Sequence, residues 1–185
     1  MKRALIGGVG NVLLGDDGVG PFILRLLESQ YSFGDGVELV DLGTPALDLT
    51  HQIVSLHSLI LIDSVKVDPV RSAPGTVVLY QKEDILRIAP AQRVDPHSPA
   101  LSECLMTAEM LGSSPQNVLL VGIVGASYEP ECALSPAVLQ SVERAIDAVL
   151  RELQRLGFTY QKKPIPDDAG LWWSNDQAAL SEVRG

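Results

Sequence analysis

The fold is decided by Gly7-Gly8-Val9-Gly10-Asn11-Val12-Leu13-Leu14-Gly15-Asp16-Asp17-Gly18-Val19-Gly20-Pro21, which follows the short apolar run Ala4-Leu5-Ile6. The apolar run predicts a first β-strand, and the residues from Val19 onward have the spacing of an amphipathic helix. Glycines let the backbone take positive φ and let other groups approach closely. Open α/β folds place their ligands at the loop that follows a first strand. We therefore expect this glycine loop to line the functional site.

Asp16 and Asp17 stand where the chain enters that helix. The local sequence favours a capping role, because Asp is a favoured N-cap and a negative charge at a helix N-terminus is stabilised by roughly 0.3–1 kcal/mol. One Asp would be enough for this purpose. A pair on a glycine-flanked loop therefore leaves one carboxylate for a role outside the helix, which depends on the other residues that reach the same place.

Composition limits the class of protein. The formal charge of −9 argues against a nucleic-acid partner, since phosphate binding relies on clustered Lys and Arg. The sequence has no apolar run long enough for a bilayer and no signal-peptide pattern, so we expect a soluble, cytoplasmic protein without membrane insertion. Cys104 and Cys132 lack metal or disulfide spacing, and we expect both to be buried as small apolar side chains.

The pattern of apolar residues predicts one domain over residues 1–157. Four further strands are expected, at 37–42, 59–63, 76–80 and 118–124. The linker after Asp63 lacks a helical crossover, so the strand at 76–80 should run antiparallel. Helices are expected at 19–30, after Thr44, after Ser98 and from Ser135 to Gly157. The prediction is a three-layer α/β/α domain with a mixed, mostly parallel five-stranded sheet and one antiparallel strand.

Residues 158–185 have a different composition. They are polar and rich in proline, and they contain both tryptophans of the chain. We expect this segment to be a C-terminal tail outside the core domain. An aromatic pair in such a tail could dock on its own domain or on a partner.

Three polar side chains are expected to meet at one crevice. Asp17 follows the first strand, Asp63 ends the third, and His97 precedes a helix at the end of a long proline-containing segment. Each also has a purely structural interpretation, as a cap for the carboxylates and as a hydrogen-bonded side chain for His97. Two carboxylates and an imidazole suit a divalent transition metal without selecting one. Three protein ligands leave positions open for substrate or water.

At this point the sequence resembles the endopeptidases that mature nickel–iron hydrogenases. The resemblance covers residues 3–156 and rests on pieces in the family's order: residues 8–20, Asp41-Leu42-Gly43-Thr44, Leu61-Ile62-Asp63, His97, Gly122-Ile123 and Leu134-Ser135-Pro136. The metal-binding and catalytic positions of the family correspond to Asp17, Asp63 and His97. The tail after Gly157 lies outside the resemblance.

The resemblance implies a peptidase that removes the C-terminal extension of a hydrogenase large-subunit precursor after nickel insertion. Nickel is expected to be supplied by the precursor, not held permanently, and to be recognised through Asp17, Asp63 and His97. Whether the metal or an Asp activates the water stays open. Two alternatives remain: a non-catalytic chaperone that checks the nickel with the same residues, and a nucleotide-binding module. The second is weakened by Leu13, which stands where the dinucleotide fingerprint has its third glycine.

Overall fold

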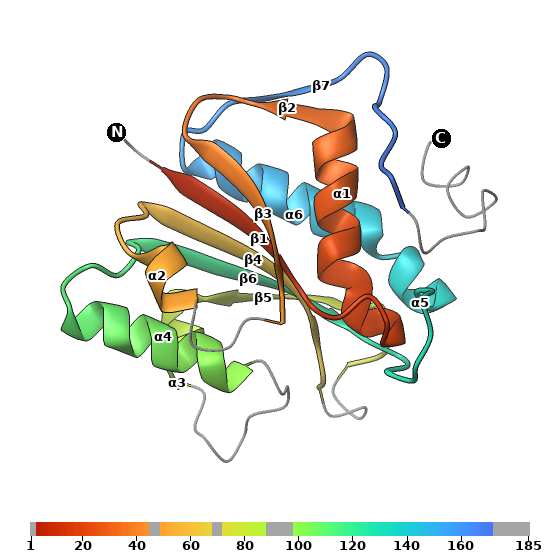
Figure 1. Ribbon diagram of the computed structural model, residues 1–185, viewed down its shortest axis with the longest axis horizontal. Helices are drawn as coiled ribbons and strands as arrows, with labels where there is room; N and C mark the ends of the chain where they lie inside the picture. The colour runs from red at the N-terminus through yellow and green to blue at the C-terminus, as the bar shows by residue number, and fades with distance from the viewer. Residues whose placement is uncertain (1–2, 45–48, 68–71, 88–97, 172–185) are drawn as a thin grey trace.

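The computed structural model describes residues 3–44, 49–67, 72–87 and 98–171, and it has three layers (Figure 1). The central layer is a five-stranded sheet in the order β3-β1-β4-β6-β5, in which only β5 runs antiparallel to its neighbour. This confirms the predicted mixed sheet with one reversed strand. The strands are β1 (Ala4–Val9), β3 (Val37–Gly43), β4 (Ser58–Val65), β5 (Val77–Gln81) and β6 (Asn117–Val124).

Helices cover both faces of the sheet. One face packs against α1 and α6, and the other packs against α2, α3 and α4. The helices are α1 (Val19–Gln30), α2 (Leu49–Ile53), α3 (Lys82–Arg87), α4 (Ser98–Met110), α5 (Pro136–Leu139) and α6 (Val142–Arg155), with a 3-10 turn η1 (Gly15–Gly18) before α1. Helix α3 was not expected, and α2 is shorter than expected. Within the described segments no helix combines the length and the apolar character needed to cross a membrane.

The middle strand β4 explains why the molecule has two cores. All eight of its residues are buried. Successive side chains of a strand point to opposite faces, so Ile60 and Ile62 join the α1/α6 core whereas Leu59 and Leu61 join the α2/α4 core. Full burial of one such side chain contributes about 1.5–3 kcal/mol. The continuous apolar run therefore specifies a central strand, as the sequence predicted.

Helix α1 has the bounds that its periodicity predicts, and its first turn lies against the ends of β1 and β4. A Cβ atom on Gly20 would be 2.2 Å from the carbonyl oxygen of Val9 and 2.4 Å from that of Ile62. Only glycine permits so close an approach between helix and sheet. The chain after β1 is thus held directly above the ends of these two strands.

The last helical segment is divided into two helices instead of forming one. Ser135 caps α5, accepting a hydrogen bond from the Val138 N–H, and Pro136 occupies its first turn, as predicted. The Ser141 hydroxyl donates to the Val138 carbonyl at 2.7 Å, at the break before α6. Gly157, with φ +80°, ends α6 as expected, because the N–H groups of residues 157 and 158 close a Schellman pair of hydrogen bonds.

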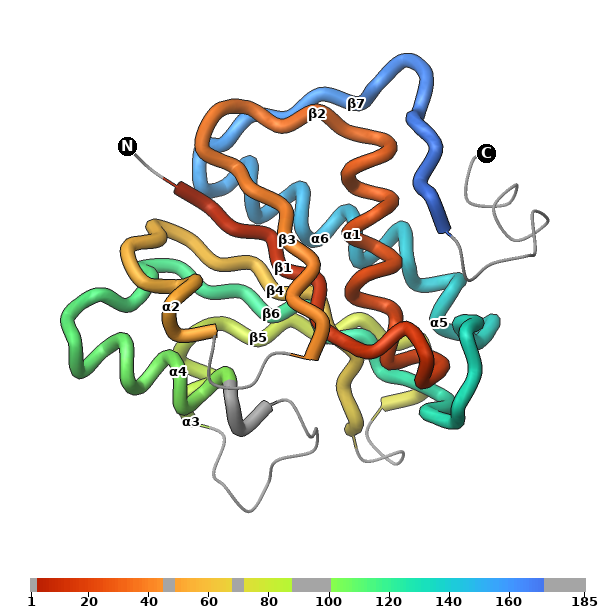
Figure 2. The backbone as a smooth tube through the Cα atoms, in the orientation of Figure 1, coloured from red at the N-terminus to blue at the C-terminus, as the bar shows by residue number. Residues whose placement is uncertain are grey.

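The segment after Gly157, which we expected outside the core, is hydrogen-bonded to the body as far as residue 167. Strand β7 (Tyr160–Lys162) pairs antiparallel with β2 (Tyr31–Phe33), which directly follows α1 (Figure 2). Beyond it, the N–H groups of Lys163 and Asp167 donate to carbonyls at the end of α1, at 2.8 and 3.0 Å. Polar composition concealed this pairing, because in the described part of this segment only Phe158, Tyr160, Ala169 and Leu171 pack against the core. Trp172 and Trp173 lie outside the described residues.

The cysteines differ in their surroundings. Cys104 is buried in the α2/α4 core, which confirms the expectation for this residue. Cys132 is exposed, so the expectation of burial was wrong for it. Its position explains the difference, since it lies in the loop between β6 and α5 and not on a face that packs against the sheet.

Candidate functional site

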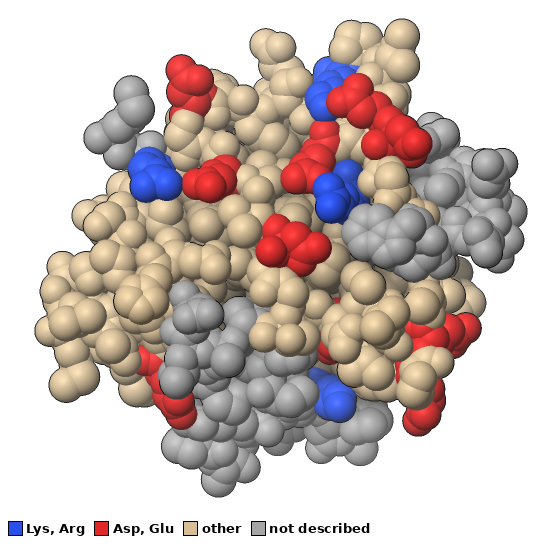
Figure 3. Space-filling view, in the orientation of Figure 1, with Lys and Arg blue, Asp and Glu red and all other residues tan. Residues whose placement is uncertain are grey.

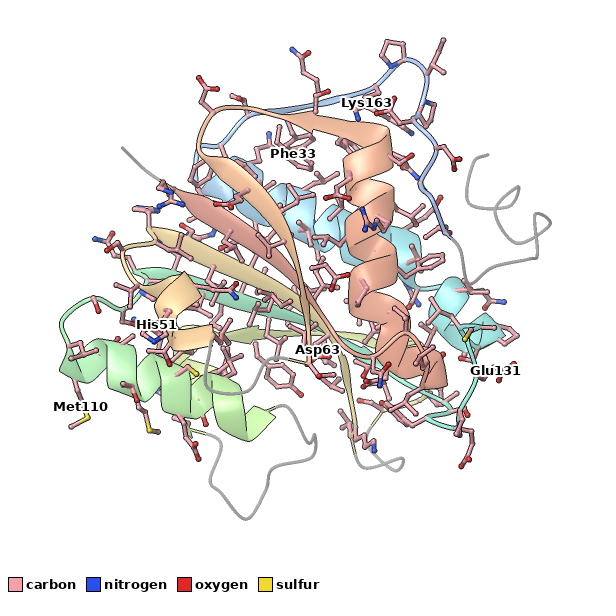
Figure 4. The ribbon with its side chains drawn as sticks, viewed as in Figure 1. Phe33, His51, Asp63, Met110, Glu131 and Lys163 are labelled. Atoms are coloured by element: carbon pink, nitrogen blue, oxygen red, sulfur yellow. The ribbon has the colours of Figure 1, made fainter. Side chains whose placement is uncertain are left out.

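The carboxyl ends of β1 and β4 form the point at which the strand order reverses. The chain leaves β1 for β3 on one side and later returns to β4 on the other side of β1. Open α/β sheets bind ligands in the crevice outside such a point. Asp17 lies in η1, the first helical turn after β1, and Asp63 lies near the end of β4, where Figure 4 labels it. Each is only 5% exposed.

Asp17 is fixed from two sides. The Ser64 hydroxyl donates to Oδ1 at 3.1 Å, and the Asn11 N–H donates to Oδ2 at 2.8 Å. A carboxylate offers about four lone-pair positions, and these two bonds occupy one on each oxygen. Asp17 is therefore oriented by the protein and retains acceptor capacity for a cation or a proton donor.

The glycine loop makes this position possible. Gly10 has φ +135°, and a Cβ atom there would lie 1.7 Å from the carbonyl oxygen of Asp17. The loop thus folds back on itself with no room for a side chain at Gly10. Its N–H donates to the carbonyl of Gly43 at 2.7 Å, which ties the loop to the end of β3.

Asp16 has a different role from its neighbour. Its carboxylate is fully buried and accepts hydrogen bonds from Ala126 N–H at 2.7 Å, Ser127 N–H at 3.0 Å, Ser135 N–H at 2.7 Å and Ser135 Oγ at 2.9 Å. Three of these bonds end on Oδ2 and one on Oδ1, so four donors from two segments fix both oxygens of the carboxylate. Asp16 therefore joins the glycine loop to the segment between β6 and α5.

Neither carboxylate caps α1, although the local sequence favoured that role for one of them. The N-cap of α1 is Gly18, and no side chain hydrogen-bonds to it. The physical reason is the intervening 3-10 turn η1, which places Asp16 and Asp17 before the helix and directs them toward other segments. Asp16 is held by the segment between β6 and α5, whereas Asp17 lies at the carboxyl ends of β1 and β4, so the pair does divide between two roles.

Asp63 occupies the side of β4 that faces α2 and α4, by alternation with Leu59 and Leu61. Helix α4 runs antiparallel to this strand. Its carboxyl end lies at the opposite edge of the sheet, since the Ser55 N–H, just before β4, donates to the Ser113 carbonyl, just after α4. With 13 residues, α4 is about 20 Å long, so it begins near the edge that carries Asp63 (Figure 1).

His97 lies outside the described residues, directly before α4. The structure therefore brings two of the three predicted side chains to one edge of the sheet and places the start of the helix that follows the third at the same edge. In the part of the chain that is described, no group of three His, Cys, Asp or Glu side chains could hold a metal ion. Two buried carboxylates with a histidine would form an oxygen and nitrogen donor set suited to a divalent transition metal.

The glycine loop does not resemble a phosphate site. Such a site needs several backbone N–H groups directed at the ligand. Here the Asn11 N–H donates to the Asp17 carboxylate, and the Asp16 N–H donates to the Ser127 carbonyl. Other N–H groups of the loop that donate within the protein belong to Gly10, Leu13, Leu14, Gly15 and Asp17. The nucleotide-binding alternative is therefore set aside.

Ser64 was not predicted to be part of the candidate site. The residue follows Asp63 on β4, and strand alternation turns its side chain to the opposite face, toward α1 and the glycine loop. A polar residue in a continuous buried strand was the available signal. Its partner Asp17 is 47 residues away in sequence, so the hydrogen bond itself could not be inferred locally.

Comparisons with known proteins agree on one family. The model of the hydrogenase maturation protease family matches residues 21–152. The Hydrogenase 2 maturation protease of Escherichia coli K12 is 32% identical over 155 residues, which are 84% of this chain and 93% of that protein. The hydrogenase expression/formation protein HoxM of Azotobacter vinelandii is 32% identical over 161 residues, which cover 80% of this chain and 76% of that protein.

Two solved structures extend this agreement to the fold. The hydrogenase maturating endopeptidase HybD from E. coli superposes with a TM-score of 0.81 at 31% identity, covering 87% of this chain and 98% of that one. The [NiFe] hydrogenase maturation protease HybD from Thermococcus kodakarensis superposes with a TM-score of 0.65 at 25% identity, and the match covers 81% of this chain and 98% of that one.

Proposed function

This chain belongs to the hydrogenase maturation protease family, and from that premise we propose that it removes the C-terminal extension of a nickel–iron hydrogenase large-subunit precursor. The protein is an endopeptidase, as its relatives are, so a purely non-catalytic chaperone role is not supported. The precursor brings nickel with it, and the protease acts after the metal has been inserted. The observation that carries the proposal is the position of Asp17 and Asp63 at the reversal point of the sheet.

The nickel of the precursor is recognised by Asp17, Asp63 and His97. Three features support this assignment. The carboxylate of Asp17 is oriented by Ser64 and retains acceptor capacity. Asp63 lies on the neighbouring strand at the same edge, and α4, which follows His97, begins near it. An incomplete set of ligands suits a metal that is already bound elsewhere, because the remaining coordination positions belong to the precursor.

The two carboxylates can contribute to hydrolysis in two ways. A divalent metal polarises a carbonyl and lowers the pKa of a bound water. If that suffices, Asp17 and Asp63 serve only as ligands that position the precursor. Alternatively, one of them accepts the proton of the attacking water as a general base. Substitution of Asp63 by Asn separates these roles, since an amide oxygen can still contact the metal but cannot accept the proton.

The decisive experiment compares two forms of one substrate. Purified protein is incubated with the precursor, loaded with nickel or free of it, and the precursor mass is followed by mass spectrometry. We expect shortening at the C-terminus of the loaded form alone. Shortening of the nickel-free form at the same rate would contradict the recognition role, and no shortening of either form would contradict the proposed cleavage.

Variants then test each residue. Asp17→Ala, Asp63→Ala and His97→Ala should each abolish shortening of the loaded precursor. Asp147→Asn is a matched control, because it removes a carboxylate from the exposed surface of α6. Asp63→Asn should retain binding to the loaded precursor in a pull-down yet lose turnover if Asp63 is the base, whereas turnover should largely persist if Asp63 only contacts the metal, because the amide oxygen keeps that contact. A variant with normal activity would remove its residue from the site.

A further inference from the structure

A lysine stands beside the candidate site on a fixed aromatic ring. The Lys66 ammonium lies 4.3 Å from the centroid of the Tyr128 ring. Lys66 follows the last residue of β4, and Tyr128 lies in the loop after β6. Val65 and Val124 are the last paired residues of these two strands. Both side chains therefore come from just beyond the edge of the sheet at which Asp63 lies.

The ring of Tyr128 is held in place by the backbone. Its hydroxyl donates to the Val65 carbonyl at 3.3 Å. It also lies so close to the chain that a Cβ atom on Gly125 would be 2.5 Å from the hydroxyl oxygen. A cation above such a ring gains about 0.5–1 kcal/mol at an exposed site. Tyr128 thus restricts an otherwise flexible lysine to one part of the surface.

The charge around Lys66 is negative. Three described segments lie at this edge of the sheet, 10–18, 63–67 and 125–135, and Lys66 is the only basic residue in them, whereas Glu129 and Glu131 are exposed acids. Acidic side chains also outnumber basic ones on the face in Figure 3, in line with the net charge of −9. Lys66 is exposed and forms no ion pair with any residue that the structure describes. Within these described segments, Lys66 is the one positive partner that an anionic group would meet.

We propose that Lys66, positioned by Tyr128, binds a carboxylate of the substrate peptide close to the scissile bond and thereby contributes to substrate choice. The proposal rests on the proposed function above. Lys66 is three residues beyond Asp63 and directly follows β4, and an extended chain of this length separates the two Cα atoms by about 10 Å. The carboxylate therefore lies within a few residues of the cleaved bond. It belongs to an Asp or Glu side chain or to the C-terminus of the precursor.

The test measures kcat/KM for the nickel-loaded precursor at low and at physiological ionic strength. Lys66→Glu should lower kcat/KM about tenfold at low salt, chiefly through KM, because it opposes like charges. Lys66→Met should give a smaller loss and a weaker dependence on salt. Lys162→Glu is the matched control, since it makes the same change of charge at an exposed position of β7, at the far end of α1, and should leave kcat/KM unchanged.

Altered substrates identify the carboxylate. One precursor has the acidic side chains near the cleavage site changed to Asn or Gln, and another has its C-terminus extended by neutral residues. The substrate that has lost the partner of Lys66 should be cleaved equally well by the wild-type protein and by Lys66→Met. Tyr128→Leu should reproduce part of the Lys66→Met effect, whereas Tyr128→Phe, which keeps the ring, should have less effect.

Two outcomes overturn the proposal in distinguishable ways. If the wild-type protein cleaves the loaded precursor, and both Lys66 variants match it in kcat/KM and salt dependence, Lys66 has no role in substrate binding and the proposed function stands. If the wild-type protein does not shorten the loaded precursor, the proposed function fails and the role of Lys66 fails with it.

Discussion

The Ser64 hydroxyl donates a hydrogen bond of 3.1 Å to the Asp17 carboxylate. This bond joins β4 to the turn that follows β1, so it links the two elements that carry Asp63 and Asp17. Both residues are buried, and the bond is shielded from water. Ser64 therefore acts as a positioning residue for the candidate site.

Loss of this hydroxyl should affect activity more than stability. Ser64→Ala should lower the free energy of unfolding by about 1 kcal/mol, the usual effect of one hydrogen bond, while kcat for the loaded precursor falls several-fold because Asp17 is less well oriented. Ser141→Ala is the matched control, since it removes another buried hydroxyl bond, to the Val138 carbonyl, away from Asp17. Equal kcat values for the two variants would contradict the positioning role.

Substitution of Asp16 should lower stability more than substitution of its neighbour Asp17. Asp16→Ala leaves four donors without their acceptor, and we expect it to cost at least about 3 kcal/mol of unfolding free energy. Asp17→Ala removes two hydrogen bonds and should cost about 1–2 kcal/mol. Urea unfolding midpoints at unchanged m-value measure the difference. A larger loss for Asp17→Ala would show that the structural role is assigned to the wrong residue.

The same pair shows where inference from sequence ends. Periodicity is local, so it predicted α1 to its observed bounds and identified β4 as a buried central strand. The roles of Asp16 and Asp17 depend on partners far along the chain: Ala126 is 110 residues from Asp16, and Ser64 is 47 residues from Asp17. The local sequence indicated that one of the two carboxylates was available for a role outside the helix. It did not indicate which donors surround each of them.

The attachment of the segment after Gly157 was not predicted, for a related reason. A polar, proline-rich segment lacks the apolar periodicity that indicates a packed element. Its attachment comes mostly from backbone hydrogen bonds to β2 and to the end of α1, which depend little on side-chain type as long as the donor is not proline. The antiparallel strand β5 was predicted because the length of a connection, which is visible in the sequence, limits how strands can be joined.

The close contact between Gly10 and Asp17 should make Gly10→Ala severe. The added methyl group would overlap the Asp17 carbonyl, 1.7 Å away, so the loop must move and carry Asp17 with it. Gly112→Ala is the control, because Gly112 also has positive φ but has no atom within 4 Å of its would-be Cβ. The unfolding free energy of Gly112→Ala should fall by only roughly 1 kcal/mol, because alanine is strained at positive φ. Cleavage rates and urea unfolding of both variants should separate backbone strain from displacement of Asp17. A similar loss of cleavage in both variants would contradict displacement of Asp17 as the cause.

The raised pKa of Tyr31 should make the stability of the protein fall at alkaline pH. Partial burial raises the pKa of this phenol above its usual value of 10.0, and the negative charges of Asp147, Tyr160 and Glu143 add to the effect. The folded state holds the Tyr31 proton more tightly than the unfolded state does. The contribution of this group to stability is therefore complete below about pH 10 and is lost as pH rises through the folded pKa. The unfolding free energy of the wild-type protein should therefore fall more steeply above pH 10 than that of Tyr31→Phe. Parallel curves would contradict the assignment.

The contact of β7 with β2 predicts the effect of shortening the chain. A protein that ends at Gly157 loses the two-stranded sheet, the Lys163 and Asp167 backbone bonds, and the T-shaped contact of Tyr160 with Tyr31, whose ring centroids are 6.0 Å apart. A protein that ends at Leu171 keeps all of them and is the reference. If the lost contacts contribute about 3 kcal/mol in total, the shorter protein should melt roughly 6–12 °C below the longer one. Calorimetry of the two measures this difference. Equal melting temperatures would mean that the segment adds nothing to folding, despite its hydrogen bonds, and that the folded unit ends with α6.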